Sequence, residues 1–417
     1  MKLIPHAIQR FWNGLPLPFK TMTRKYLYAT AIPALRLMRG RPRAHIADGE
    51  MRSFGQAGCD VFFGYYDICP FDATETRLLA QSVRSGAKTA DILCYDLQSD
   101  RSPSVLAATP AWCWQQGARL TWWDSGSLVA HNDIHNGIPV TTVRHAQTGH
   151  IESIIPHPMY DVSSDRRLGL SLNFARLQRL RPGYGYKIND STAYQSAPET
   201  DGIMLVETTN GAGRLLLSLA DAASLDPLPS MADAEHYFNH AAWAPDGRHF
   251  LVFHLWTDGR RRQARALVVD VHTGAVTRPA GQAKVSHYAW LDEDHLLLTG
   301  DEPGRGFGYH LYHRENGWLG QIGAETLHRD GHPSPRPGAS DMMITDTYPD
   351  RLSERHLLCV TRAGHVRTLA SLFSPPLLEG EHRCDLHPRW SPSGRMICVD
   401  SAHLGRRQIC VLTPKTL

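Results

Sequence analysis

HAAWAPDGRHFLVFHLW at 240–256, HYAWLDEDHLLLTG at 287–300, HPSPRPGASDMMITD at 332–346 and HPRWSPSGRMICVDS at 387–401 are four copies of one pattern. Each copy opens with a histidine, continues through a short extended stretch and a turn, and ends in an apolar strand. The successive histidines are 47, 45 and 55 residues apart, and three of the four copies place Trp three residues after the histidine. A repeat of this length is typical of the four-stranded blade of a β-propeller.

The turns inside these copies favour the same interpretation. In APDG and SPSG, proline presets φ at the first turn position and glycine supplies the positive φ that reverses the chain. Weaker copies begin at Tyr65, Gln115 and Tyr160. The sequence therefore predicts an all-β fold, a propeller of seven blades.

Two irregularities refine this prediction. The interval 187–235 is longer than one connection needs, so we expect an insertion in blade three. The C-terminal blade ends early, after RQICVLT, so we expect its outermost strand to come from residues near 45–55 and to close the ring.

Charge divides the chain near residue 45. Residues 1–45 carry nine Lys or Arg and no acid, whereas the formal net charge of the whole chain is +3, which leaves about −6 for the rest. We expect a basic extension over 1–45 and a propeller over 46–417. The acidic body excludes nucleic-acid binding by charge. The extension is either loosely packed or in peripheral contact with an anionic membrane surface.

The eight cysteines show no CxxC pair and no regular spacing. Buried free thiols are the simplest interpretation, and they favour a reducing compartment. The sequence has no apolar run long enough to span a bilayer, and Pro33 and Arg36 interrupt its one signal-like stretch. A cytoplasmic or membrane-associated location is favoured over a periplasmic one.

The repeated histidines are the first candidate site. Equivalent positions of successive blades meet around one axis, so His240, His287, His332 and His387 should converge on the central channel. Imidazole nitrogens are ligands for Mn and Zn, and the four side chains are therefore candidate ligands of a divalent metal. The alternative is that each histidine is a structural hydrogen-bonding residue copied with its blade.

The early blades and one arginine-rich run supply candidates for glycan contact. Tandem aromatics followed by polar side chains suit a sugar site, although they are equally suited to blade packing; these are Tyr65, Tyr66, Asp67, Gln116 and Asn132. The run LNFARLQRLRPGYGY at 172–186 adds Asn173, Arg176, Arg179, Arg181, Tyr184 and Tyr186. Arginine binds carboxylates through two parallel hydrogen bonds, which suits an acidic sugar; the alternative is a solvated loop paired with the acidic body.

The blade HPRWSPSGRMICVDSAHLGRRQICVL resembles those of TolB-like propellers, and the histidine opening successive blades resembles the oligogalacturonate lyase family. That resemblance implies a seven-bladed propeller that cleaves acidic oligosaccharides by β-elimination, with a divalent metal, typically manganese, on channel histidines. It carries the metal role onto His240, His287, His332 and His387, although the family's glutamine ligand has no counterpart near His332 or His387. The runs FFGYYDICPF and LNFARLQRLRPGYGY are also similar to propellers associated with bacterial exopolysaccharide production.

Two functions remain open from the sequence. The first is a polysaccharide lyase acting on a uronic-acid-containing glycan, with Tyr66, His240, Arg181 and Tyr186 as the catalytic candidates. The second is a non-catalytic propeller that binds glycan or protein partners during polysaccharide assembly.

Overall fold

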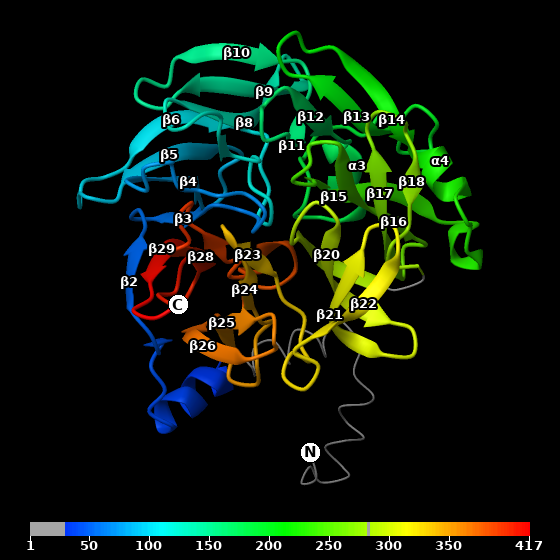
Figure 1. The fold of residues 1–417 in the computed structure, drawn as a ribbon. Helices are drawn as coiled ribbons and strands as arrows, with labels where there is room; N and C mark the ends of the chain where they lie inside the picture. Colours follow the sequence, from blue (N-terminus) through cyan, green and yellow to red (C-terminus); the bar gives the residue numbers. More distant parts are fainter. Residues whose placement is uncertain (1–29, 282–283) are drawn as a thin grey trace, which may run out of the picture.

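The computed structural model describes residues 30–281 and 284–417, and within them the strands form seven antiparallel sheets arranged as a ring (Figure 1). Each sheet is built mainly from strands that are consecutive in the sequence, which defines it as a blade. The predicted all-β fold, a seven-bladed β-propeller, is confirmed.

The first three blades follow one another along the chain. Blade one consists of β3 (Cys59–Phe62), β4 (Arg77–Arg84), β5 (Ala90–Asp96) and β6 (Ser104–Thr109). Blade two consists of β7 (Thr121–Trp122), β8 (Leu128–His135), β9 (Ile138–His145) and β10 (Ile151–Ile155). Blade three consists of β11 (Met159–Val162), β12 (Leu168–Ser171), β13 (Gly202–Glu207) and β14 (Gly213–Ser218).

The remaining blades contain the four histidine-led copies. Blade four consists of β15 (Glu235–Trp243), β16 (His249–Thr257), β17 (Arg262–Asp270) and β18 (Val276–Thr277). Blade five consists of β19 (Lys284–Trp290), β20 (His295–Glu302), β21 (Gly306–His313) and β22 (Gly317–Ile322). Blade six contains β23 (Ser334–Arg336), β24 (Ala339–Asp346), β25 (Glu354–Thr361) and β26 (Val366–Phe373). Blade seven contains β27 (Arg389–Trp390), β28 (Ile397–Ser401) and β29 (Gln408–Thr413).

The ring closes with a strand from the N-terminal side. β2 (Glu50–Phe54) pairs antiparallel with β29, with Ser53 opposite Cys410, and supplies the fourth strand of blade seven. This confirms the closure that the short C-terminal blade predicted.

Residues just before β2 also add to the ring. A helix over 30–38 precedes β1 (Ala44–Ile46), which pairs with β26 and becomes a fifth strand of blade six. The buried Arg36 of this helix donates to Glu354 at 2.8 Å. The domain boundary at residue 45 stays a prediction, and residues 1–29, with most of the predicted basic extension, lie outside the described part. No helix among the described residues is both long and apolar enough to cross a bilayer.

Blade three carries the long excursion. Residues 172–201 separate β12 from β13, so the insertion begins before the predicted interval 187–235. The chain leaves the sheet at Asn173, whose side chain accepts from the Arg176 N–H and caps α3 (Phe174–Leu180). A second short helical stretch, α4 (Leu219–Ser224) followed by η1 (Pro229–Met231), leads into blade four.

The innermost strands are irregular where they line the channel. Strand register shifts between Met159 and Asp161 in blade three, between Asn239 and Ala242 in blade four, and between Val285 and His287 in blade five. A β-bulge redirects a side chain, and these bulges lie at Tyr160, at His240 and at Ser286, next to His287. All eight cysteines are free, and seven of them are buried, as predicted.

Candidate functional site

Three of the four repeated histidines form one contiguous cluster. The ring centroids of His287 and His332 are 4.1 Å apart, and those of His332 and His387 are 4.4 Å apart. Tyr65 contacts His387 at 4.9 Å on one side and stacks on His240 at 5.0 Å on the other. The predicted convergence of histidines from blades four to seven is therefore present, with a tyrosine between His240 and the other three.

Hydrogen bonds orient each imidazole of the cluster through its Nδ1 atom. His287 Nδ1 lies 2.9 Å from Asp330 Oδ1, and His332 Nδ1 lies 2.7 Å from Asp346 Oδ1. His387 Nδ1 donates to the Gly64 carbonyl oxygen at 2.7 Å. An imidazole that donates through Nδ1 presents the lone pair of Nε2, which is the usual arrangement of a metal-binding histidine.

The electrostatics keep His287 and His387 neutral. Burial holds the pKa of His287 below, and that of His387 well below, the ordinary 6.5. Although burial alone would raise it, the interactions with His332 hold the pKa of Asp346 below its usual range. A neutral imidazole beside an ionised carboxylate is the protonation state that a metal ligand requires.

The donor set fits a divalent metal. His332 Nε2 and His387 Nε2 are buried and form no hydrogen bond within residues 30–281 and 284–417. Ligand atoms of these two histidines and of Asp385 lie within 4.8 Å of one another. Asp385 also pairs with Arg355 at 2.6 Å and with Arg383 at 2.6 Å. Burial alone would raise the pKa of Asp385, but these two arginines hold it well below the usual range. Unpaired buried nitrogens are costly unless something binds them.

His240 has different surroundings. Its Nε2 lies 3.1 Å from Asn239 Nδ2, 3.4 Å from Arg181 Nη1 and 3.4 Å from the Tyr65 hydroxyl. Burial, reinforced by Arg181, holds the pKa of His240 well below 6.5. The backbone of His240 has φ +59°, a conformation that a non-glycine residue rarely adopts and that is often found at functional sites. His240 is thus a neutral hydrogen-bond acceptor facing a guanidinium.

Arg181 and three of the four predicted tyrosines, Tyr65, Tyr66 and Tyr184, lie around the histidines. Tyr186 does not. Tyr184 lies edge-on to His240 at 6.2 Å and under the Arg181 guanidinium at 3.8 Å. The Tyr66 hydroxyl donates to the Tyr288 carbonyl at 2.7 Å, and burial raises its pKa well above 10. Tyr186 instead stacks on Phe174 at 4.4 Å and accepts a hydrogen bond from Asn132.

The remaining candidates for glycan contact have partners within the protein. Asp67 pairs with the buried Arg119 at 2.9 Å. Gln116 donates to Tyr160 and Asn239, and Asn132 donates to the Met159 carbonyl as well as to Tyr186. Asn173 donates to Asp201, and Arg179 pairs with Asp190 at 2.9 Å and Glu235 at 2.6 Å. Arg176 is buried and donates to the backbone carbonyls of Thr192, Gln195, Ser196 and His236. The contacts of Arg176 with His236 and of Arg179 with Glu235 hold the insertion against blade four, and glycan contact by all of these candidates stays a prediction.

A large cavity adjoins the histidine cluster. It has a volume of about 1130 Å³, and four arginines line it: Arg329, Arg351, Arg355 and Arg383. Asp330, which holds His287, lines it too, as does Tyr348, whose ring lies 6.2 Å from His332. Ile32 of the N-terminal helix forms part of the wall. The cavity therefore reaches residues that contact the cluster, although none of the cluster histidines lines it.

Sequence reasoning missed the residues that orient and neutralise the cluster. These are Asp330, Asp346, Tyr348, Arg355, Arg383 and Asp385. Asp385 stands two residues before His387, and Asp346 ends the strand of the copy that His332 opens, so both had a positional signal. Asp330, Tyr348 and Arg383 lie in connections outside the repeat, and Arg355 lies in β25.

Comparison with known proteins shows the fold. No protein-family model matches the chain, and no curated protein is similar to it in sequence. A solved oligogalacturonate lyase in complex with manganese matches with a TM-score of 0.63 at 13% identity, covering 90% of this chain and 99% of that one. The oligogalacturonate lyase from Vibrio parahaemolyticus matches with a TM-score of 0.58 at 12% identity and the same coverage. A prolyl endopeptidase matches with a TM-score of 0.51 at 10% identity, covering 98% of this chain and 51% of that one. At these identities the likeness establishes the propeller fold.

Proposed function

We propose that this protein is a polysaccharide lyase that cleaves a uronic-acid-containing glycan by β-elimination. One observation carries the proposal: the cluster of His287, His332 and His387, in which the Nε2 atoms of His332 and His387 are buried and unpaired within the described residues, lies beside His240, which faces an arginine. The likeness in fold to proteins named as oligogalacturonate lyases supports it.

The residues around His240 fit the proton transfers of an elimination. His240 Nε2 would take the proton from C5 of the uronate, and the electron pair of that C–H bond would form the C4–C5 double bond. The C4–O bond then breaks, and its electron pair goes to the departing glycosidic oxygen. Tyr65, whose hydroxyl lies 3.4 Å from His240 Nε2, would protonate that oxygen, since burial raises its pKa well above 10 and keeps the proton on it.

The cluster would hold the metal. His332 and His387 through Nε2, together with the Asp385 carboxylate, would bind Mn or Zn, with His287 as a further ligand, and the bound ion would neutralise the uronate carboxylate and so acidify the C5 proton. Arg181 stands beside His240 as a second cation for the same carboxylate. The four arginines of the 1130 Å³ cavity would attract the acidic chain toward the cluster.

A second candidate function is a non-catalytic glycan-binding propeller. The observation that favours it is burial: each of the four histidines is at most 2% exposed, and Tyr65 and Tyr66 fill the space between them. In that case the imidazoles serve packing, and the cavity alone binds glycan.

The test compares three single substitutions on metal content and on lyase activity. Activity is followed by the ultraviolet absorbance of unsaturated products from galacturonan, alginate and glucuronan. We expect His240→Gln to lose on the order of 10²–10⁴-fold in turnover with its metal retained, because it removes only the base. His387→Gln should lose metal and activity together, and the exposed His365→Gln should behave as the parent. A metal-free parent that releases no unsaturated product from any of the three glycans would overturn the lyase proposal and leave the binding propeller.

A further inference from the structure

A second cavity, of about 740 Å³, has an aromatic floor. Trp112 and Trp114 lie in the connection that enters blade two, with their rings 5.1 Å apart and nearly perpendicular. Trp114 packs on Phe62 at 5.4 Å and under the Arg407 guanidinium at 4.7 Å. Both tryptophans remain half-buried, so part of each ring faces the cavity. We call this cavity the tryptophan groove.

The rim of the groove is cationic. Arg84, Lys88 and Lys187 line it and are exposed, and Arg84 and Lys88 form no ion pair within the described part of the chain. The two acids of the lining are already paired. Asp60 lies 3.9 Å from Arg406, and Glu381 lies 3.8 Å from Lys187 and 3.6 Å from the neighbouring His382.

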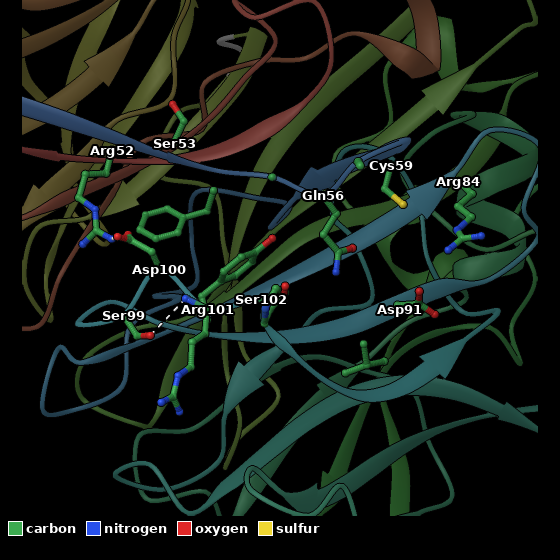
Figure 2. Close-up of a pocket in the computed structure, with 16 residues that line it drawn as sticks. Arg52, Ser53, Gln56, Cys59, Arg84, Asp91, Ser99, Asp100, Arg101 and Ser102 are labelled. Carbon is green, nitrogen blue, oxygen red and sulfur yellow. Dashed lines mark hydrogen bonds and ion pairs between the residues drawn. The ribbon is translucent and has the colours of Figure 1, made fainter.

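Arg84 extends this rim around the side of the propeller. It also lines a third cavity, of about 690 Å³, between the closing strand β2 and blade one. Figure 2 shows Arg84 beside Cys59 and Asp91, at the end of that cavity farthest from Arg52 and Asp100. Arg52 is paired with Asp100 at 3.2 Å, whereas Arg84 has no such partner among residues 30–281 and 284–417. The unpaired positive charge therefore lies at the junction with the tryptophan groove.

One short segment separates the groove from the histidine-side cavity. Residues 379, 380 and 383 line the larger cavity, while 381 and 382 line the groove. Gln115 donates to the carbonyls of Glu381 and Arg383, and Arg407 donates to those of His382 and Arg383. These bonds hold segment 379–383 as a fixed ridge, with one cavity on each side.

We propose that the tryptophan groove is a distal binding site for an acidic oligosaccharide, which takes sugar units of a chain whose cleavage site lies across the ridge at the histidines. This inference rests on the proposed function, because the chain that enters the groove would be the same acidic glycan that is cleaved at the histidines. The half-buried indole rings offer apolar surface on which a sugar ring packs, and Arg84 and Lys88 offer charge that is unpaired within the described residues to its carboxylates. The volume lies within the roughly 300–1,000 Å³ of pockets that bind small ligands.

The test measures affinity by calorimetry at low ionic strength. The probes are hexagalacturonate, a hexameric mannuronate oligomer and uncharged cellohexaose. The double charge reversal Arg84→Glu/Lys88→Glu changes only exposed side chains, so it should fold normally, and Trp114→Ala removes the aromatic floor. The matched charge control is Arg260→Glu/Arg261→Glu, two exposed residues of the β16–β17 hairpin, and Trp123→Ala is the aromatic control.

We expect the charge reversal and Trp114→Ala each to weaken binding of the acidic hexamer that the parent prefers by tenfold or more. The controls should bind as the parent does, and added salt should weaken the parent's binding. Unchanged affinity in both groove variants would overturn the inference, as would equal parental affinity for cellohexaose or no affinity for either acidic hexamer. The readout is separate from catalysis. If the parent makes no unsaturated product but the groove variants still lose binding, the result would support the groove and reject the lyase proposal.

Discussion

The substitution Asp400→Asn should destabilise the whole propeller, because Asp400 joins blade seven to the start of blade one. Its carboxylate accepts from Phe63 N at 3.0 Å and Gly64 N at 3.2 Å, and it pairs with Arg389 at 3.0 Å. Arg389 in turn donates to the Tyr65 carbonyl at 2.9 Å. The pair therefore holds the backbone that carries Tyr65 into the channel.

The magnitude follows from burial. The side chains of Arg389 and Asp400 are 1% and 2% exposed, so an asparagine at 400 leaves a guanidinium buried without its counter-charge. Breaking a buried pair in this way costs about 3–5 kcal/mol, a large part of the roughly 5–15 kcal/mol that stabilises a typical domain.

The assay is equilibrium urea unfolding followed by tryptophan fluorescence, with Asp100→Asn as the control. Asp100 pairs with Arg52 at 3.2 Å, but its side chain is fully exposed, so its loss should leave the unfolding midpoint unchanged. If Asp400→Asn shifts the midpoint no more than Asp100→Asn does, the account of the Arg389–Asp400 pair is refuted.

Three further predictions concern the same region. Burial lowers the pKa of His287 and His387, so below pH 6.5 the unfolded chain binds more protons than the folded one. The free energy of unfolding should therefore fall as the pH drops below 6.5, by about 1.4 kcal/mol for each unit of pKa lowering, and stay level above pH 6.5. A series of melting curves at different pH values measures this. Gly64→Ala should cost about 1–3 kcal/mol in urea unfolding, because Gly64 has φ +135° and a Cβ there would lie 2.9 Å from the Gln116 backbone; a neutral effect would show that the loop yields. Arg176→Met should lower the free energy of unfolding by at least about 3 kcal/mol, because it removes several charge-assisted hydrogen bonds; a fully stable variant with weakened glycan binding would instead indicate a carboxylate clamp.

The repeat predicted the ring and the convergence of the histidines for one physical reason. Blades of similar length place equivalent residues around one axis. The spacing of the four histidines therefore predicts that their side chains converge: His240, His287, His332 and His387. The closing strand followed in the same way, since a blade that ends after β29 leaves an edge that something must cover.

The partners of the histidines depend on packing between blades, which the repeat does not encode. Asp330 and Tyr348 lie in connections whose paths vary from blade to blade. Arg176 shows that residue type alone does not predict where a side chain points. Residue type alone fits its run either to a substrate clamp or to a loop paired with the acidic body. In the structure α3 turns the Arg176 side chain toward four carbonyls of the insertion and blade four, and a clamp at this run stays a prediction.

The pairing of β2 with β29 sets an order on biosynthesis. Ser53 and Cys410 are 357 positions apart, so β2 leaves the ribosome long before its partner exists. Blades one to five can form as their own residues emerge, but β2, whose one partner among the described strands is β29, must wait with both edges unpaired until blade seven is made. Such an edge is a site for pairing with another chain, so nascent chains stalled before residue 408 should be the aggregation-prone species of this protein.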